Sequence, residues 1–171
     1  MILVLTGLER FPFARLLAMV DEGLRRGLLV PPVFAQAGAG DDVPLGFPTE
    51  PRIPPERLER LIQEADLIIT HAGVGSVVRS LNAGKPTIVV PRRRDLGEHI
   101  DDHQSEFADR MEKAGYVRVA RTEEDFFRLL ADSPSPALPA AGEQPSAARK
   151  ALLSFFHLLL DTRAAGSTSE L

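Results

Sequence analysis

Cysteine is absent from this sequence of 171 residues. Its absence excludes disulfide bonds and thiolate metal sites, and it fits a chain that folds in a reducing cytoplasm. No apolar run approaches the roughly 20 residues that a membrane-spanning helix needs. The opening segment, Met1–Thr6, lacks a basic region and is too short for a signal peptide, so we expect neither a leader nor a membrane span.

A strong charge of either sign is also missing. The 20 lysines and arginines stand against 24 aspartates and glutamates, a formal net charge of -4, so no global basic field exists to hold nucleic acid. Hydrophobic residues make up 44% of the chain and charged residues 26%, which is typical of a soluble globular protein. The length therefore predicts one domain with a sizeable core.

Short apolar runs alternate with helical patterns along the first part of the chain. Buried strands are expected at residues 2–6, 33–37, 66–70, 87–90 and 116–120. Apolar spacing and helix-stop residues predict helices at about 13–24, 55–65, 77–83, 102–114 and 122–130, and Thr122-Glu-Glu-Asp125 resembles a capping box at the start of the last one. This alternation predicts an α/β fold, a Rossmann-like parallel sheet with helices on both faces.

The C-terminal part of the chain differs in composition. Residues 132–149 are rich in proline, alanine and serine and indicate a linker after a domain at 1–131. Residues 150–163 predict a helix that is apolar nearly all round, and such a helix must be buried, either on this domain or on a partner. Residues 164–171 are expected to be a frayed tail.

The segment His71-Ala-Gly-Val-Gly-Ser76 joins a predicted strand to the next helix. Gly73 and Gly75 allow close approach of a ligand to the backbone, and the helix start offers unpaired N–H groups and a positive dipole end. Ser76 adds a hydroxyl donor, so the segment suits a diphosphate. The alternative is a plain turn whose glycines only permit packing, and the pattern leaves both readings open.

A second polar segment, residues 91–104, follows the very next strand and so lies at the same carboxyl edge, where open parallel sheets bind ligands. A solvated surface loop is the alternative. His99 and His103, with Asp102, suggest a metal site, but a hydrogen-bonding role is the commoner use of such a pair. The arginines 92–94 suit a phosphate or an anionic membrane surface, or simple solvation.

Together these segments resemble the C-terminal half of family 28 glycosyltransferases. The resemblance is strongest to small stand-alone versions of that half, found in bacterial exopolysaccharide synthesis and as the catalytic subunit of the eukaryotic dolichol-linked N-acetylglucosaminyltransferase. It covers about residues 1–120. The segments that carry it are the opening strand with Gly7, Phe13-x-Arg-Leu16, His71-Ala-Gly-x-Gly-Ser76, Gly84-Lys-Pro86, Pro91-Arg-Arg93 and, most specifically, Gly97-Glu-His-x-x-Asp-His-Gln104.

The resemblance implies the donor-binding half of a GT-B enzyme, with residues 1–131 as the nucleotide-sugar-binding domain. Gly73, Gly75 and Ser76 are implied at the diphosphate, and the second segment near the sugar, the ribose or a partner. The residues implied at the UDP-sugar are Gly7, His71, Gly73, Gly75, Ser76, Arg92, Glu98, His99, Asp102, His103 and Gln104. Such enzymes use no cofactor and no bound metal, because helix N-termini and basic side chains stabilise the leaving diphosphate.

The resemblance further implies an inverting hexosyltransferase, with a donor of the GlcNAc or GlcA type, that is active only with a second chain. That membrane-associated partner would bind a lipid-linked acceptor and carry the catalytic base, so no catalytic residue is assigned here. This chain is then expected in the cytoplasm, peripheral at the inner membrane through its partner. The alternative is a non-catalytic accessory module of the same fold that stabilises a partner glycosyltransferase.

Two positions depart from the family pattern. Leu8 follows Gly7, where the family commonly has a threonine. Arg79 stands where related enzymes often place a glutamate that holds the ribose hydroxyls, and an arginine accepts no hydrogen bond. Both departures favour the accessory reading. A redox Rossmann domain is disfavoured, because Gly7 is not followed by a Gly-x-Gly-x-x-Gly fingerprint.

Overall fold

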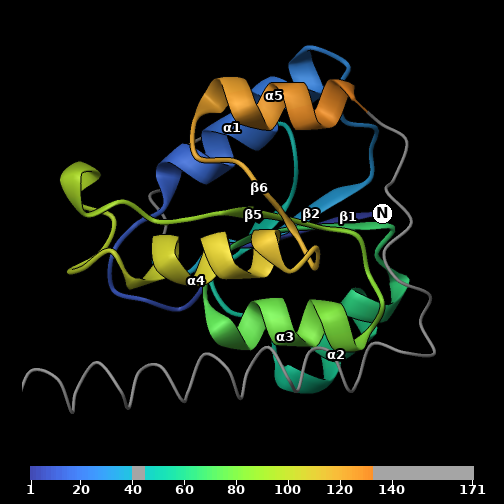
Figure 1. Ribbon diagram of the computed structural model, residues 1–171. Coiled ribbons are helices and arrows are strands. Elements are labelled where there is room, and N and C mark those ends of the chain that lie inside the picture. Colours follow the sequence, from blue (N-terminus) through green and yellow to red (C-terminus); the bar gives the residue numbers. More distant parts are fainter. Residues whose placement is uncertain (40–44, 133–171) are drawn as a thin grey trace, which may run out of the picture.

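The computed structural model describes residues 1–39 and 45–132. Within them one parallel sheet runs in the order β3-β2-β1-β4-β5-β6 (Figure 1). Its strands are β1 (Ile2–Leu5), β2 (Val33–Gln36), β3 (Thr49–Glu50), β4 (Leu67–His71), β5 (Thr87–Val90) and β6 (Arg118–Val119). The fold class is therefore the predicted Rossmann-like α/β architecture.

Helices cover both faces of this sheet. The α-helices are α1 (Ala14–Arg25), α2 (Pro55–Glu64), α3 (Val74–Asn82), α4 (His103–Lys113) and α5 (Glu123–Ala131), and a short 3-10 helix, η1, spans Arg94–Leu96. Figure 1 shows α1 and α5 on one face and α2, α3 and α4 on the other. None of the helices in the described part of the chain is long and apolar enough to cross a membrane.

Alternating side chains of β1 explain the two layers. Ile2 and Val4 pack in the cluster that contains α1 and α5, whereas Leu3 and Leu5 pack with Ile62 of α2. All four β1 residues are buried, as is typical of a central parallel strand covered on both faces. The continuous apolar run at the start of the sequence is therefore the middle of the core.

The elements match the predicted ones with small shifts. Thr122 and Asp125 form the capping box that starts α5, as predicted from the sequence. The larger shifts are that α3 begins at Val74 and not at residue 77, and that β6 covers only Arg118–Val119 of the predicted 116–120; β4 also extends one residue further, to His71. The two-residue strand β3, inside a proline-rich stretch, was not predicted. The predicted linker at 132–149 lies, apart from Asp132, outside the described residues, as do the apolar helix at 150–163 and the tail at 164–171.

The strand order creates one distinctive place. The chain runs outward from β1 to β3 and then returns, so that β4 lies against the other side of β1. The helices that follow β1 and β4 cover opposite faces of the sheet (Figure 1). The loops at the carboxyl ends of these two strands therefore part from each other, and parallel sheets of this kind bind their ligands in the resulting crevice.

Candidate ligand-binding cleft

A cleft of about 460 Å3 lies at this crevice. Its walls come from the carboxyl ends of β1, β2 and β4, from the loop after β1, and from the starts of α2 and α3. The lining residues are Leu5, Gly7, Leu8, Glu9, Gln36, Ile53, Pro55, Leu58, His71, Gly73, Val74, Gly75, Ser76 and Arg79. Apart from Gln36, apolar residues therefore line the β2 and α2 side, whereas the α3 side has the first residues of the helix with Ser76 and Arg79.

The N-terminus of α3 supplies the donors on that side. The cap residue is Gly73, which has no side chain to cap the helix. Its carbonyl accepts from the amides of Ser76 and Val77 at 3.1 Å each. The amides of Val74 and Gly75 have no acceptor among the described residues, as expected for the first two positions of a helix. Two unpaired amides and the positive end of the helix dipole thus lie in the wall of the cleft, an arrangement that binds anions.

His71 lies in the same wall of the cleft, against Gly7 and Gly73. Its side chain is buried, with 6% exposed, and its Nδ1 lies 3.2 Å from the carbonyl oxygen of Leu5. A β-carbon added to Gly7 would lie 2.7 Å from the His71 Nε2 atom, and one added to Gly73 only 2.0 Å from it. Both glycines are therefore required by the imidazole ring, and Gly7 also by its φ of 90°.

Gly75 differs from these two glycines. A β-carbon there would meet no atom within 4 Å, and α3 would gain from a better helix former at this position. Packing therefore explains Gly7 and Gly73, while Gly75 leaves open space at the helix start. Gly75 is therefore the glycine of this turn that packing does not explain and that the close approach of a ligand would explain.

The pKa of His71 is lowered to about 4, chiefly because the ring is buried. The hydrogen bond to the Leu5 carbonyl raises this pKa, whereas the nearby charges of Arg92 and His99 lower it. His71 is consequently neutral at neutral pH. Since a carbonyl oxygen only accepts, the ring proton is on Nδ1 and the lone pair is on Nε2.

The second polar segment, after β5, is organised around a buried arginine. The Arg92 side chain is 1% exposed, and its guanidinium donates to the carbonyl oxygens of Thr6 at 2.7 Å, Phe11 at 2.8 Å and Glu98 at 2.9 Å. It also lies over the ring of Phe13, at 4.7 Å from the ring centroid. Arg92 therefore ties the loop after β1 to the loop after β5.

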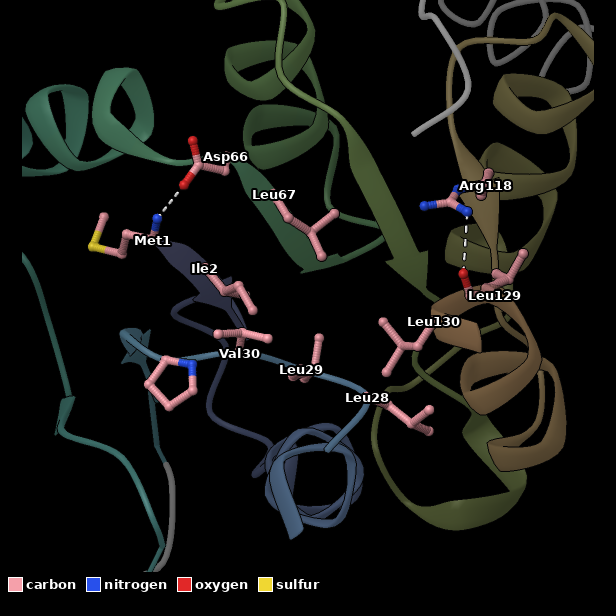
Figure 2. A pocket seen from close by; sticks show the side chains of 11 residues that line it. Met1, Ile2, Leu28, Leu29, Val30, Asp66, Leu67, Arg118, Leu129 and Leu130 are labelled. Atoms are coloured by element: carbon pink, nitrogen blue, oxygen red, sulfur yellow. Dashed lines mark hydrogen bonds and ion pairs between the residues drawn. The ribbon is translucent and has the colours of Figure 1, made fainter. Parts of the chain in front are cut away.

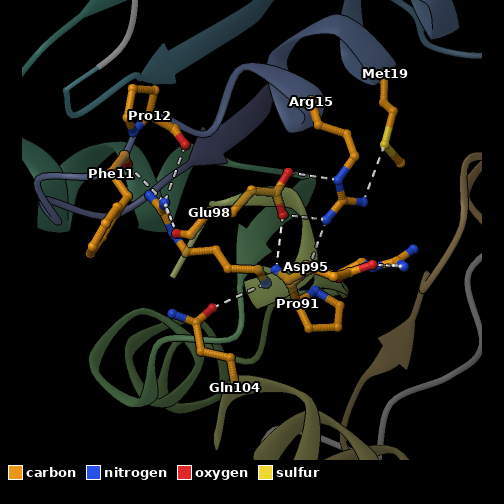
Figure 3. A network of polar contacts seen from close by, with 10 residues as sticks. Phe11, Pro12, Arg15, Met19, Pro91, Asp95, Glu98 and Gln104 are labelled. Carbon is orange, nitrogen blue, oxygen red and sulfur yellow. Dashed lines mark hydrogen bonds and ion pairs between the residues drawn. The ribbon is translucent and has the colours of Figure 1, made fainter. Parts of the chain in front are cut away.

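Glu98 is a second buried brace of this segment (Figure 3). Both of its carboxylate oxygens accept from Arg15 of α1 at 2.8 Å, and one also accepts from the amide of Arg93 at 2.9 Å. Gln104, the third buried polar residue of the segment, accepts from the amide of Arg92 at 3.3 Å. These side chains satisfy groups of the protein itself and hold the loop in one conformation.

The histidine pair is joined by Asp101 and not by the predicted Asp102. The Asp101 carboxylate lies 3.0 Å from the Nδ1 of His99 and 3.9 Å from the Nε2 of His103. Asp102 is the exposed cap residue of α4. Among residues 1–39 and 45–132, no group of three or more histidine, aspartate or glutamate side chains could hold a metal ion.

The predicted site residues thus fall into two groups. Five of them line the cleft: Gly7, His71, Gly73, Gly75 and Ser76. Arg92, Glu98, His99, Asp102, His103 and Gln104 do not line it, and their predicted contacts with a donor stay predictions. The sequence did not predict the side of the cleft formed by β2 and α2, because only the strand order brings this side beside β1. Its residues are Gln36, Ile53, Pro55 and Leu58.

A second cavity, of about 340 Å3, lies at the opposite, amino edge of the sheet (Figure 2). It is lined mainly by the aliphatic side chains of residues 28–30, 129 and 130. The half-buried guanidinium of Arg118 in its wall donates to the carbonyl of Leu129 at 3.1 Å. None of the predicted site residues lies there, so the carboxyl-edge cleft is the candidate site.

Comparison with known proteins gives a family match. The model of the glycosyltransferase family 28 C-terminal domain matches residues 56–155, more than half of the chain. A UDP-N-acetylglucosamine transferase subunit ALG13 of Cryptococcus neoformans is 44% identical over 68 residues, which are 39% of this chain and 32% of that protein. The human protein of the same name is 37% identical over 90 residues, 50% of this chain and 8% of its own length. The chain thus spans about a third or less of these relatives.

Solved structures share the fold. The solution structure of ALG13 has a TM-score of 0.60 at 21% identity, covering 91% of this chain and 96% of that chain. The crystal structure of Acinetobacter baumannii MurG has a TM-score of 0.51 at 24% identity, covering 86% of this chain and 44% of that one. The likeness extends over nearly all of the first structure and less than half of the second.

Proposed function

Because the chain belongs to the family of glycosyltransferase family 28 C-terminal domains, we propose that it binds the UDP-sugar donor of a hexosyltransferase that is split across two chains. The observation that carries the proposal is the pair of unpaired amides, Val74 and Gly75, at the start of α3 in the wall of the cleft. The names of the relatives, UDP-N-acetylglucosamine transferase subunits, support a UDP-linked hexose as the ligand.

The diphosphate occupies the α3 side of the cleft in this proposal. The amides of Val74 and Gly75 donate to phosphate oxygens, and the hydroxyl of Ser76 adds a third donor. The helix dipole and Arg79, one turn further along α3, contribute positive potential. These groups replace a metal ion as the stabiliser of the negative charge that develops when the diphosphate leaves.

The nucleoside occupies the opposite side. Ile53, Pro55 and Leu58 form an apolar surface against which a uracil ring can lie. Gln36 is buried at the carboxyl end of β2, where its side-chain oxygen accepts from the amide of Ile53 at 3.1 Å. This hydrogen bond holds the segment before α2 in place, so the apolar surface is fixed before the ligand binds.

A partner chain is proposed to close the carboxyl edge. Of the four exposed large hydrophobic side chains among the described residues, Leu8, Leu96 and Ile100 lie on the two loops at this edge. Exposed apolar residues beside charged ones are typical of protein interfaces. The partner would bring the lipid-linked acceptor and the catalytic base, and would place this chain peripherally at the cytoplasmic side of the inner membrane.

Calorimetric titration tests the donor-binding proposal directly. UDP, UDP-GlcNAc, UDP-GlcA and, as a base control, GDP are titrated into the chain alone and into its complex with the candidate partner. We expect UDP and at least one UDP-sugar to bind, with GDP weaker. Absence of binding of every uridine nucleotide in both states would contradict the proposal.

The accessory role remains the second candidate because of Arg79, which lines the cleft where a carboxylate is implied by the family resemblance. Transfer assays with radiolabelled UDP-sugars and lipid-linked acceptors separate the two functions. A donor-binding subunit supports transfer that stops when the Gly75 position is blocked. An accessory module leaves transfer by the partner unchanged by any substitution in this cleft.

A further inference from the structure

His71 lines the same cleft as the start of α3, where the anion is proposed to bind. Its Nδ1 proton is engaged by the Leu5 carbonyl at 3.2 Å, so Nε2 is the free acceptor of the ring. The Nε2 atom lies against Gly7 and Gly73, the two glycines of the cleft wall that a β-carbon would force into the ring. No described residue donates to it. A phosphate oxygen next to Nε2 would therefore be repelled, because both atoms would present lone pairs and neither would donate a proton.

Several charged groups surround the ring. Arg92 and His99, on the loop after β5, act on His71 electrostatically, and both disfavour its protonation. Glu9 from the loop after β1 and Arg79 from α3 share the cleft with it. In the free protein burial, assisted by Arg92 and His99, keeps His71 neutral at neutral pH.

Two changes would remove the clash between the lone pairs. A tautomer switch would move the proton to Nε2, but Nδ1 would then face the Leu5 carbonyl with a lone pair at 3.2 Å. The neighbouring Thr70 hydroxyl would compensate poorly, since it is already 3.1 Å from the same carbonyl and 3.4 Å from Nδ1. Protonation keeps the Leu5 bond and adds a charge-assisted one.

We propose that His71 takes up a proton from solvent when the diphosphate enters the cleft, so that Nε2–H donates to a phosphate oxygen while Nδ1–H stays on Leu5. The inference rests on the proposed function, because it needs a diphosphate at the start of α3. No covalent bond forms or breaks in this step. Donor binding is thereby linked to pH, and the cation at position 71 exists only in the loaded site.

Calorimetry in buffers of different ionisation enthalpy measures the proton directly. A UDP-sugar is the probe, because both of its phosphates stay fully ionised near neutral pH and release no proton of their own. If the anion raises the pKa of His71, a fraction of a proton is taken up on binding at neutral pH, and we expect affinity to rise up to about tenfold from pH 8 to pH 6. The 15N shifts of the His71 ring then report an imidazolium.

Two variants assign the proton. His71→Gln places an amide N–H near the Nε2 position and donates without titrating, so we expect it to bind the UDP-sugar without proton uptake. His99→Gln removes the other nearby imidazole and is expected to keep the uptake. Uptake that survives in His71→Gln, or that disappears in His99→Gln, overturns the assignment.

The remaining outcomes separate this inference from the proposed function. Binding of the UDP-sugar without proton uptake, with 15N shifts of a neutral ring, overturns the proton linkage and leaves the proposed function intact. A neutral ring with its proton on Nε2 identifies the tautomer switch. Failure of the UDP-sugar to bind overturns both proposals.

Discussion

The loops after β4 and β5 lie at the same edge of the sheet, yet they use their polar groups in opposite ways. The turn after β4 is short and carries little charge, and its backbone amides at Val74 and Gly75 are free for a ligand. The loop after β5 holds arginines, acids and histidines, but Arg92 and Glu98 are buried and bonded to the protein itself.

Loop length explains the difference. The chain reaches α3 two residues after β4, so few backbone groups need partners. The connection from β5 to α4 runs from residue 91 to residue 102 with only η1 as regular structure. Side chains must therefore provide the hydrogen-bond partners that secondary structure does not provide for the backbone of this loop, since unpaired buried polar groups are costly. A concentration of charged residues in a loop can therefore indicate an internal brace and not a ligand site.

The largest test of this comparison is Arg92→Met. The substitution keeps apolar contact with Phe13 but removes the donors to four carbonyl oxygens, those of Thr6, Phe11, Pro12 and Glu98. We expect a loss of about 3 kcal/mol in the free energy of unfolding, measured by urea denaturation. The control, Arg94→Met, changes an exposed residue of the same loop and should cost less than about 0.5 kcal/mol. Equal losses in the free energy of unfolding for the two variants would show that the Arg92 hydrogen bonds do not hold the two loops together.

A second test uses the pH dependence of stability. The pKa of His71 is lowered from 6.5 to about 4 on folding, so between these values the unfolded chain binds more protons. The stabilisation by neutral His71 is complete above about pH 6.5 and is lost as pH falls toward 4. We expect the wild type to lose about 2 kcal/mol more than His71→Gln from pH 7 to pH 5, measured by urea denaturation. A pH dependence that is identical in both proteins would contradict the burial of a neutral ring.

Particular residues show how far the sequence alone reaches. Apolar runs and turn residues were sufficient to predict every strand except β3, and all five α-helices, because burial on both faces of a parallel sheet leaves a strong pattern. The Thr122 capping box was predictable for a different reason, because its donors and acceptors lie within four consecutive residues.

Long-range contacts were beyond such reasoning. Nothing in the Arg-Arg-Arg stretch at 92–94 distinguishes the buried Arg92 from the half-buried Arg93 and the exposed Arg94, because the partners of Arg92 lie up to 86 residues away in the chain. Gly73 and Gly75 look equivalent in the sequence, although only Gly73 is needed by the His71 ring. The roles of both loops depend on which strands are neighbours, and no local signal contains that order.

The third test compares those two glycines. Gly75→Ala places a methyl group in open space within the first turn of α3, so we expect stabilisation of up to about 1 kcal/mol in urea denaturation. The same methyl group would enter the space proposed for the diphosphate, and UDP affinity should fall about tenfold or more by calorimetry. Gly73→Ala, in contrast, should lose stability because it clashes with the His71 ring. An unchanged UDP affinity in Gly75→Ala would mean that the diphosphate does not lie at the start of α3.

The smallest expected change in stability comes from Arg79→Glu. This variant tests whether the cleft wall formed by β4 and α3 lacks a side chain that can accept hydrogen bonds from the ribose hydroxyls. Arg79 pairs with Glu59 at 3.4 Å on the surface, so reversing its charge should cost only about 0.5 kcal/mol. A carboxylate accepts hydrogen bonds from ribose hydroxyls and an arginine does not. Because the Arg79 side chain is 46% exposed and its charge is screened, one or two such bonds should outweigh the loss of that charge and raise UDP affinity about tenfold in calorimetry.

Arg79→Gln is the matched variant, because it removes the cation without adding a carboxylate. We expect Arg79→Glu to bind UDP more tightly than the wild type, and Arg79→Gln to bind it equally or slightly less tightly. The reverse order, with the glutamate variant weakest, would mean that Arg79 itself contacts the anion. The cleft would then have exchanged a ribose ligand for a phosphate ligand, and the donor-binding reading would gain over the accessory one.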